Sequence, residues 1–188
     1  MTVSVSADLD RKFREAAGSS GDLDVAYDLL DTPIGELLVA VTDRGLCRIS
    51  FDPEPEREEE ALAQLYGTRV LRAARPVDRA RRELDEYLTG RRREFDLATD
   101  LRIEAPFRQA VLSELGRVPY GATTTYGELA RRAGRPRAAR AVGTFMNRNP
   151  IPIVLPCHRV VGSTGSLVGY GGGLDRKEAL LRLEGVLV

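Results

Sequence analysis

The stretch TYGELARRAGRPRAARAVGTFMNR, residues 125–148, decides how the second half of the chain folds. Thr125 and Glu128 have the spacing of a capping box at a helix start, and Gly134 is placed to end that helix. A second helix is expected directly afterwards, with Pro136 in its first turn. Two short helices joined by a tight turn that contains glycine are typical of a helix-turn-helix motif.

The second of these helices is unusual in composition. It carries two arginines, Arg137 and Arg140, among four small residues, which are Ala138, Ala139, Ala141 and Gly143. A helix that reads bases in the major groove usually carries several long polar side chains. A low profile instead suits close approach to a duplex in a narrow groove, where one arginine can enter the base stack. Tight packing against a neighbouring helix explains the small residues equally well, and the sequence leaves both interpretations open.

An apolar, strand-like run follows, IPIVLPCHRV at residues 151–160, and it leads into Cys157, His158 and Arg159. A thiol is a nucleophile only when it is deprotonated, a form that nearby cations favour. A buried cysteine beside a histidine is more often structural than reactive. Because His158 is the only histidine in the chain, its position here favours a nucleophile. Cys47 has no such neighbours and is expected in the core.

The Cys157 thiol would have to lose its proton by an indirect route. Neighbouring side chains of an extended segment point to opposite faces, so we do not expect Cys157 to bond His158 directly. A bridging water or a bend after Pro156 would connect them, with a carboxylate orienting the imidazole. Glu184 and Glu178 are the candidates for that carboxylate by position.

The sequence before residue 106 is expected to form a separate domain. Strands are expected over residues 36–42 and 46–51 with a turn between them, and helices from about Glu56 and from Pro76 to Gly90. The boundary falls between Asp100 and Ala105. We therefore expect an N-terminal α+β domain over residues 25–102 and a second domain over residues 103–188. Residues 1–24 are polar, with a flexible break at residues 18–21, and are expected to be loosely ordered.

Charge and composition narrow the class of protein. The 188 residues have no formal net charge, yet residues 1–100 hold 15 basic and 22 acidic residues, and residues 101–188 hold 13 and 6. The two parts therefore carry −7 and +7, which suits either mutual attraction or a basic domain that meets a polyanion. No run is long enough to span a bilayer, and no secretory signal is evident. Two cysteines and one histidine argue against a disulfide framework or a zinc site, so a reducing cytoplasmic location is expected.

Three segments carry a resemblance to a known family: RAARAVGTFMNRNPIPIVL (137–155), PCHRVVG (156–162) and GYGGGLDRKEALLRLEG (169–185). Together they closely resemble the O6-alkylguanine-DNA alkyltransferases, or methylated-DNA–protein-cysteine methyltransferases. The resemblance is nearly continuous from Pro106 to Gly185, and residues 31–51 are similar to the family's N-terminal domain. It implies an α+β protein with a small ribonuclease-H-like α/β domain, followed by a mostly helical winged helix-turn-helix domain that carries the active-site cysteine.

The resemblance also implies an activity. Members of this family flip out O6-alkylguanine, with O4-alkylthymine as a further candidate, and transfer the alkyl group irreversibly to their own cysteine in a single turnover. The implied partner is double-stranded DNA that contains alkylated bases, contacted through the minor groove largely without regard to sequence. A monomer is expected, with cooperative binding left open. No metal or organic cofactor is implied, because the thiol is both nucleophile and final acceptor.

Four residues would carry out the chemistry by this resemblance. Cys157 looks like the alkyl acceptor, and His158 with Glu184 looks like a relay, through a water, that removes the thiol proton. Asn149 resembles the family's hinge asparagine, which holds the turn before the active-site segment.

Other residues would bind the substrate or the duplex. Arg140 looks like the arginine that fills the gap left by the extruded base, and Tyr126 like the tyrosine that helps to rotate the 3′ phosphate. Tyr170 resembles the tyrosine that donates to guanine in the pocket. The remaining predicted contacts are Ala138, Ala139, Gly143, Met146, Arg159, Val160 and Val161.

The sequence departs from the family pattern in a few places. Arg108 and Leu112 stand where the family often has Gln and Trp, which we expect to repack that helix. Gly171 stands where serine is common, which we expect to open the pocket to bulkier adducts. The zinc-ligand set of some animal members is missing, and the N-terminal extension has no counterpart.

Two other classes of function remain open at this point. One is a DNA-binding regulator in which alkylation of Cys157 is a signal, although no second acceptor cysteine or further DNA-binding module is evident. The other is a cysteine-dependent hydrolase, which would turn over repeatedly and would leave Arg140 and its alanine-rich helix without a role.

Overall fold

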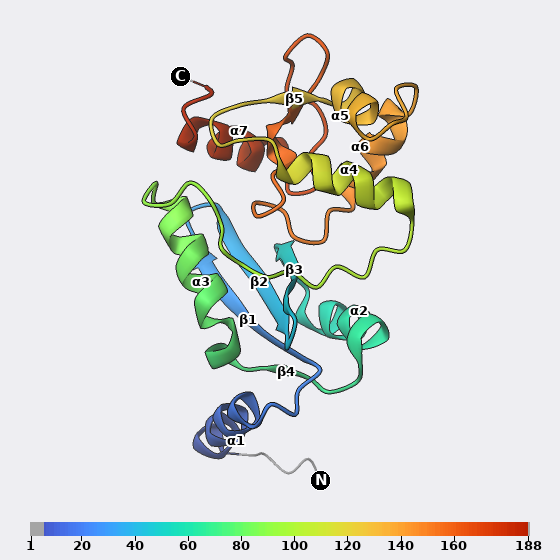
Figure 1. Cartoon of the computed structure of the whole chain (residues 1–188). Helices are drawn as coiled ribbons and strands as arrows, with labels where there is room; N and C mark the ends of the chain where they lie inside the picture. Colours follow the sequence, from blue (N-terminus) through green and yellow to red (C-terminus); the bar gives the residue numbers. More distant parts are fainter. Residues whose placement is uncertain (1–5, 188) are drawn as a thin grey trace. The chain divides into compact units, whose positions relative to one another are not determined.

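The computed structural model describes residues 6–187 of the chain (Figure 1). It divides into two compact units. The first runs up to Asp85 and includes Asp96–Leu101, and the second comprises Glu86–Phe95 and the chain from Arg102 onward. The segment of residues 86–95 therefore groups with the C-terminal unit, although it precedes residue 102 in the sequence.

A four-stranded sheet forms the centre of the first unit. Its order is β3-β2-β1-β4, in which β1 pairs antiparallel with β2 and parallel with β4, and β2 pairs antiparallel with β3. Gly45 makes the hairpin between β2 and β3 possible, because its φ is 137° and a Cβ there would lie 2.2 Å from the Ala98 carbonyl oxygen. The expected strands and turn are confirmed. The elements are β1 (Val25–Thr32), β2 (Gly35–Thr42), β3 (Gly45–Phe51), α2 (Pro55–Tyr66), β4 (Val70–Arg72) and α3 (Ala74–Leu88).

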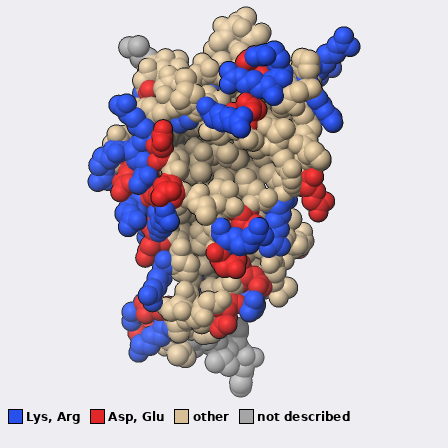
Figure 2. Space-filling model, in the orientation of Figure 1, with Lys and Arg blue, Asp and Glu red and all other residues tan. Residues whose placement is uncertain are grey.

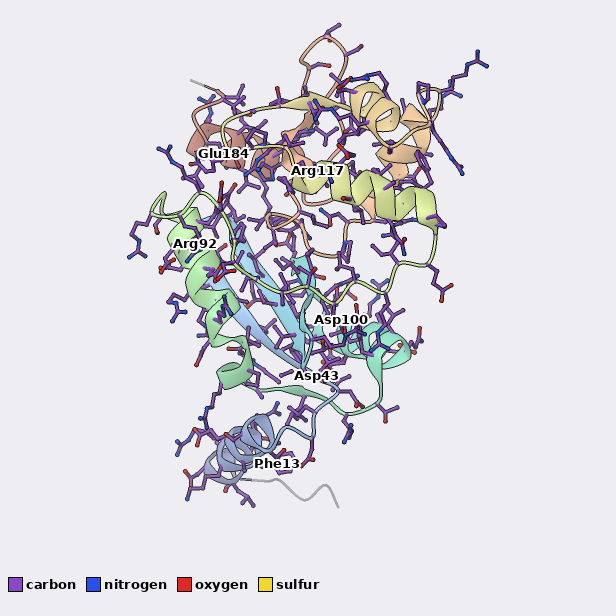
Figure 3. The ribbon with its side chains drawn as sticks, in the orientation of Figure 1. Phe13, Asp43, Arg92, Asp100, Arg117 and Glu184 are labelled. Carbon is purple, nitrogen blue, oxygen red and sulfur yellow. The ribbon has the colours of Figure 1, made fainter. Side chains whose placement is uncertain are left out.

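The expectation that residues 1–24 are loosely ordered is wrong for their greater part, because a helix, α1 (Ala7–Ser20), forms there. The Ser6 side chain caps its start by accepting from the Leu9 amide, and Gly21 ends it with a φ of 78°. Arg14 pairs with Asp10 at 2.7 Å along the helix. Phe13 is exposed on this helix (Figure 3). Residues 1–5 lie outside the described residues.

The second unit is built mainly from short helices, and its helix-turn-helix is confirmed. The Thr125 side chain accepts from the Glu128 amide at the start of α5, as the capping-box spacing predicts. Pro136 is not in the first turn of the next helix, because a tight turn from Arg135 to Ala138 precedes that helix. The elements are α4 (Pro106–Gly116), β5 (Thr124–Thr125), α5 (Tyr126–Arg132), α6 (Ala139–Asn147), a single 3₁₀ turn η1 (Cys157–Arg159), β6 (Val160–Val161) and α7 (Leu174–Leu183), with β5 and β6 paired in parallel.

Residues 151–157 do not form the expected strand. The Leu155 amide donates to the Ile151 carbonyl at 2.9 Å, and Ile153 has a φ of 75°, so the backbone turns back on itself. The physical reason is the run of prolines at 150, 152 and 156, which have no amide hydrogen to donate to a sheet. The segment therefore delivers Cys157 at the start of a 3₁₀ turn and not at the end of a strand.

The core of the second unit lies where α4, α5 and α6 meet. Its buried residues include Val111, Leu115, Leu129, Val142 and Met146, and Cys157 belongs to the same cluster. Within residues 6–187, no helix has both the length and the apolar character that crossing a membrane requires.

Candidate functional site

Cys157 is the residue around which the site is organised. It is 3% exposed, and it opens η1 directly after Pro156. Burial raises the pKa of its thiol to about 11, although a hydrogen bond with the Asn149 side chain lowers it in part. The thiol is therefore protonated at neutral pH and needs a nearby proton acceptor before it can react.

Asn149 holds the turn that precedes the cysteine. Its Nδ2 donates to the Leu155 carbonyl at 2.8 Å, and its Oδ1 accepts from the Ile151 amide at 3.2 Å. These bonds give hydrogen-bond partners to the Leu155 carbonyl and the Ile151 amide in a segment whose prolines prevent regular strand pairing. The Asn149 side chain thus bonds the backbone at both ends of the turn that leads to Cys157.

His158 supplies a proton acceptor. It is fully buried, and its Nε2 lies 2.8 Å from Glu184 Oε1. Burial lowers the pKa of the imidazole, more than the hydrogen bond to Glu184 raises it, so the ring is neutral at pH 7. A neutral ring that faces a carboxylate through Nε2 carries its hydrogen there, which leaves a lone pair on Nδ1. Nδ1 is buried and has no hydrogen-bond partner among residues 6–187.

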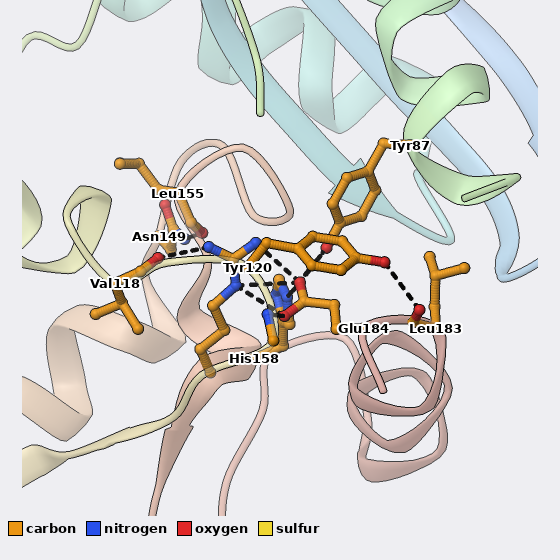
Figure 4. A network of polar contacts seen from close by, with 10 residues as sticks. Tyr87, Val118, Tyr120, Asn149, Leu155, His158, Leu183 and Glu184 are labelled. Carbon is orange, nitrogen blue, oxygen red and sulfur yellow. Dashed lines mark hydrogen bonds and ion pairs between the residues drawn. The ribbon is translucent and has the colours of Figure 1, made fainter. Parts of the chain in front are cut away.

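Glu184 is the carboxylate that orients this ring (Figure 4). It follows the last residue of α7 and is 6% exposed. Its Oε1 accepts from Arg159 Nη2 at 2.9 Å, and its Oε2 accepts from the Gly121 amide at 3.1 Å. Burial by itself would raise the pKa of this carboxyl, but hydrogen bonds from His158 and Arg159 hold it at about 2. Glu178, the other candidate, pairs with Arg182 at 2.8 Å and has no part in the site.

Arg159 was expected among the DNA contacts, and the structure places it elsewhere. It is 6% exposed, and its Nη1 donates to the Val118 carbonyl at 2.6 Å while its other nitrogens bind Glu184. Its guanidinium is therefore a buried counter-charge for Glu184 and does not face a duplex.

The expected pocket residues gather around the cysteine. Burial raises the pKa of Tyr170 well above its ordinary value, and the charge of a deprotonated Cys157 would raise it further. Met146 and Val160 belong to the same buried cluster as Cys157, and Tyr126 packs against that cluster. Val161 is 6% exposed, beside Val160 on β6.

Sequence reasoning missed two residues of the site. Lys177 is fully buried, and its Nζ donates to the Val160 carbonyl at 2.6 Å and the Val168 carbonyl at 2.9 Å. Its spacing from Leu180, Leu181 and Glu184 on one helix face could have revealed it. Tyr87, whose hydroxyl donates to Glu184, lies among apolar residues of its helix such as Leu84 and Leu88, and no pattern in the sequence singles it out.

The surface of α5 and α6 is basic (Figure 2). Arg137 and Arg140 are exposed, and neither guanidinium has an ion pair within residues 6–187. Ala138, Ala139 and Gly143 are half-buried beside them. Tyr126 ends in a hydroxyl that donates to the Val168 carbonyl at 3.0 Å.

The described residues offer no metal site, since no three His, Cys, Asp or Glu side chains among them gather to hold an ion. The fold and the site define a helix-turn-helix protein with a buried cysteine beside a histidine–carboxylate pair.

Comparison with known proteins gives the family. Residues 25–101 match the model described as "6-O-methylguanine DNA methyltransferase, ribonuclease-like domain", and residues 106–186 match the corresponding "DNA binding domain". The chain therefore belongs to the 6-O-methylguanine DNA methyltransferase family.

Relatives and solved structures agree with this assignment. The chain is similar to the methylated-DNA–protein-cysteine methyltransferase of Methanosarcina barkeri, at 42% identity over 163 residues that cover 84% of this chain and 96% of that protein. The corresponding protein of Mycolicibacterium paratuberculosis is also 42% identical, with 85% and 92% covered. A crystal structure of Mycobacterium tuberculosis OGT in complex with DNA superposes with a TM-score of 0.73, at 40% identity and with 85% and 92% covered.

Proposed function

We propose that this protein repairs duplex DNA by transferring the alkyl group of O6-alkylguanine to Cys157 Sγ, once per molecule, with O4-alkylthymine as a second substrate. The observation that carries the proposal is the buried thiol next to a neutral imidazole whose Nδ1 has no partner among the described residues. Family membership supports the reaction, and the site geometry supports the choice of residue.

The proton on the thiol leaves first. Because the pKa of Cys157 is about 11, a thiolate is scarce at neutral pH unless a base accepts the proton. His158 is neutral, and its bare Nδ1 is the acceptor, through a bridging water. Glu184 stabilises the imidazolium that forms, through the 2.8 Å bond to Nε2.

The transfer itself is a displacement at carbon. The sulfur–carbon bond forms as the bond from carbon to guanine O6 breaks, and the electron pair of that bond stays on guanine. The proton that His158 took from the thiol passes to guanine, which leaves the base neutral and restores the neutral imidazole. Tyr170 keeps its proton because burial raises its pKa, so it can donate to the guanine as charge develops there. The product is a thioether, which offers no easy route of hydrolysis, so the protein is spent after one transfer.

The target base has to leave the helix to reach a thiol that is 3% exposed. We propose that α6 lies against the minor groove and that Arg140 fills the space left by the flipped nucleotide. Gly143 supports this over the packing interpretation of the small residues. A Cβ there would meet only Tyr126 ring carbons at 3.9 Å, so packing within the protein does not require glycine.

We also propose that the protein acts as a monomer and in the cytoplasm. Every residue of the site comes from one unit of one chain, so a monomer suffices, and any cooperativity arises between neighbouring copies on DNA. Contacts that fall mainly on phosphates make binding independent of sequence and sensitive to salt. A cytoplasmic location fits the requirement for a reduced acceptor thiol.

A duplex that carries one labelled O6-methylguanine tests the proposal. We expect label to move from DNA to protein in the wild type and in Cys47→Ala, and not to move in Cys157→Ala. Cys47 is a matched control because it is also a buried cysteine that forms no disulfide within residues 6–187. Label on Cys157→Ala protein, or repair without labelled protein, would contradict it.

A further inference from the structure

We propose that Tyr87 is a positioning residue of the proton relay, whose hydroxyl keeps His158 neutral by donating to the carboxylate oxygen that His158 also uses. The inference rests on the proposed function, in which His158 accepts the proton of Cys157. It concerns a residue that lies 70 positions before the cysteine, at the end of α3.

The placement of Tyr87 is well defined by its neighbours. Residues 86–95 group with the second unit, so the contacts of Tyr87 with the site lie within that unit. The side chain is fully buried, with the Phe95 ring 5.0 Å from its own and Tyr120 edge-on at 6.0 Å. Figure 4 shows the phenol pointing at Glu184.

The hydroxyl makes two contacts in the relay. It donates to Glu184 Oε1 in a short bond, and its oxygen lies 3.3 Å from His158 Nε2. Burial raises the pKa of Tyr87, and the negative charge of Glu184 raises it further. The phenol therefore keeps its proton throughout the working range of pH. Because that proton is directed to Glu184, the oxygen presents a lone pair to His158. Both atoms that face Nε2 are therefore acceptors, which favours the Nε2–H tautomer and a bare Nδ1.

The same bond weakens the attraction of Glu184 for a proton on His158. A carboxylate stabilises an imidazolium beside it, and a donor on the same oxygen disperses part of the charge. The short bond to Glu184 outweighs the longer contact with Nε2, so the net effect of the hydroxyl is to lower the pKa of His158. Four other charged or titratable groups face His158. Arg159 and Lys177 are cations that oppose its protonation, and the other two are the Cys157 thiol and the Glu184 carboxylate.

The single histidine of this chain makes the proposal directly measurable. In protein labelled with ¹⁵N-histidine, one pair of ring signals reports the tautomer and the titration midpoint of His158. We expect the wild type to show the Nε2–H tautomer and Tyr87→Phe to raise the midpoint by about one pH unit, the size of shift that one lost hydrogen bond to a charged group produces. The acidic limb of the alkyl-transfer rate should move by the same amount.

Tyr120→Phe is the matched control. It also removes one phenol from the same aromatic cluster, but its hydroxyl donates to the Leu183 carbonyl at 2.8 Å, away from His158. We expect its midpoint to equal that of the wild type. Equal midpoints in Tyr87→Phe and the wild type would overturn the proposal, because Tyr87 would then only fill space.

A second measurement covers the case in which Tyr87→Phe does not fold. Incorporation of 3-fluorotyrosine makes every phenol a stronger donor, so the midpoint of His158 should fall, and an unchanged midpoint would contradict the proposal. Failure of the proposed function gives a different result, since Cys157 would then take no alkyl group while the titration of His158 still responded to Tyr87.

Discussion

Among the single residues of the site, Cys157 has to react although its burial disfavours the thiolate. Burial of Cys157 removes the reacting sulfur from bulk solvent, but it also raises the pKa of the thiol to about 11. A neutral histidine with a bare Nδ1 removes that obstacle without leaving a permanent charge inside the unit. Among the buried charges that the site does hold, Glu184 and Arg159 are paired with each other, and Lys177 donates to two backbone carbonyls.

The rate of transfer should follow the protonation of His158. Burial lowers the pKa of its imidazole below the ordinary value, and only the neutral ring can accept a proton. We expect the single-turnover rate to be flat from neutral pH upward and to fall in acid, as the pH drops through that lowered pKa. A rate that instead rose about tenfold per pH unit between about pH 7 and 9 would show that free thiolate reacts without the relay.

The ion pair of Glu184 with Arg159 should matter to stability. Glu184→Gln leaves a buried guanidinium without its counter-charge, which costs about 3–5 kcal/mol of unfolding free energy. Glu178→Gln is the control on the same helix, where a surface pair with Arg182 is lost at a cost below about 1 kcal/mol. Urea denaturation compares the two variants, and equal losses would contradict the account.

The pH dependence of stability follows from the same group. The folded-state pKa of Glu184 is about 2, below its ordinary value, so its contribution is complete above the unfolded pKa and is lost as the pH falls through the folded one.

The sequence singles out Cys157 and His158 as the candidate reactive pair, but it predicts only part of their surroundings. Cys157 and His158 could be found because a sole histidine next to a cysteine is conspicuous. Position along the chain leaves Glu184 and Glu178 open, because the choice depends on how α7 packs, and only the family resemblance favours Glu184. Tyr87 was missed because a tyrosine on an apolar helix face reads as core, and its contact spans 97 residues of sequence.

At the scale of elements, two segments present the site: the α5–α6 pair and the turn at residues 151–157. The α5–α6 pair followed from local signals, a capping box and a glycine, which act within a few residues. The turn was taken for a strand because its residues are apolar. The three prolines within residues 150–156, which deny the segment ladder hydrogen bonds, decided otherwise.

Arg140 should matter only when a base has to leave a duplex. We expect Arg140→Ala to slow transfer from duplex DNA by about tenfold, because the free energy equivalent to tenfold is only part of the cost of unstacking one base. Transfer from a free alkylated guanine should be unchanged. Arg182→Ala removes the same charge from α7 and controls for general electrostatics. Equal losses in both variants would remove the special role of Arg140.

Gly143 separates the two explanations of the small residues on α6. Alanine fits beside Tyr126, so Gly143→Ala should stabilise the helix by about 0.5–1 kcal/mol. If α6 approaches the duplex closely, the same methyl group weakens DNA binding. Thermal melts and a binding titration measure both effects. Gly116→Ala on α4 is the control, with no expected effect on affinity, and unchanged affinity in Gly143→Ala would place α6 away from DNA.

At the scale of the whole molecule, chemistry and charge are distributed unevenly. The Cys157–His158–Glu184 arrangement lies within the second unit, and residues 101–188 carry the positive excess that suits a polyanion. The class of fold could be predicted because strand and helix signals occur together before residue 100, whereas mainly short helix signals follow residue 106. The helix α1 was missed because its polar composition resembles that of a disordered segment, although local ion pairs and a serine cap support it.

In the proposed function, one molecule accepts one alkyl group, on Cys157. The most direct test is the intact mass of the protein after incubation with excess duplex DNA that contains O6-methylguanine. We predict a single gain of about 14 daltons, the mass of one methyl group in place of a proton, which does not increase with time and maps to Cys157. Repaired DNA beside protein of unchanged mass would contradict the account and indicate an enzyme that turns over.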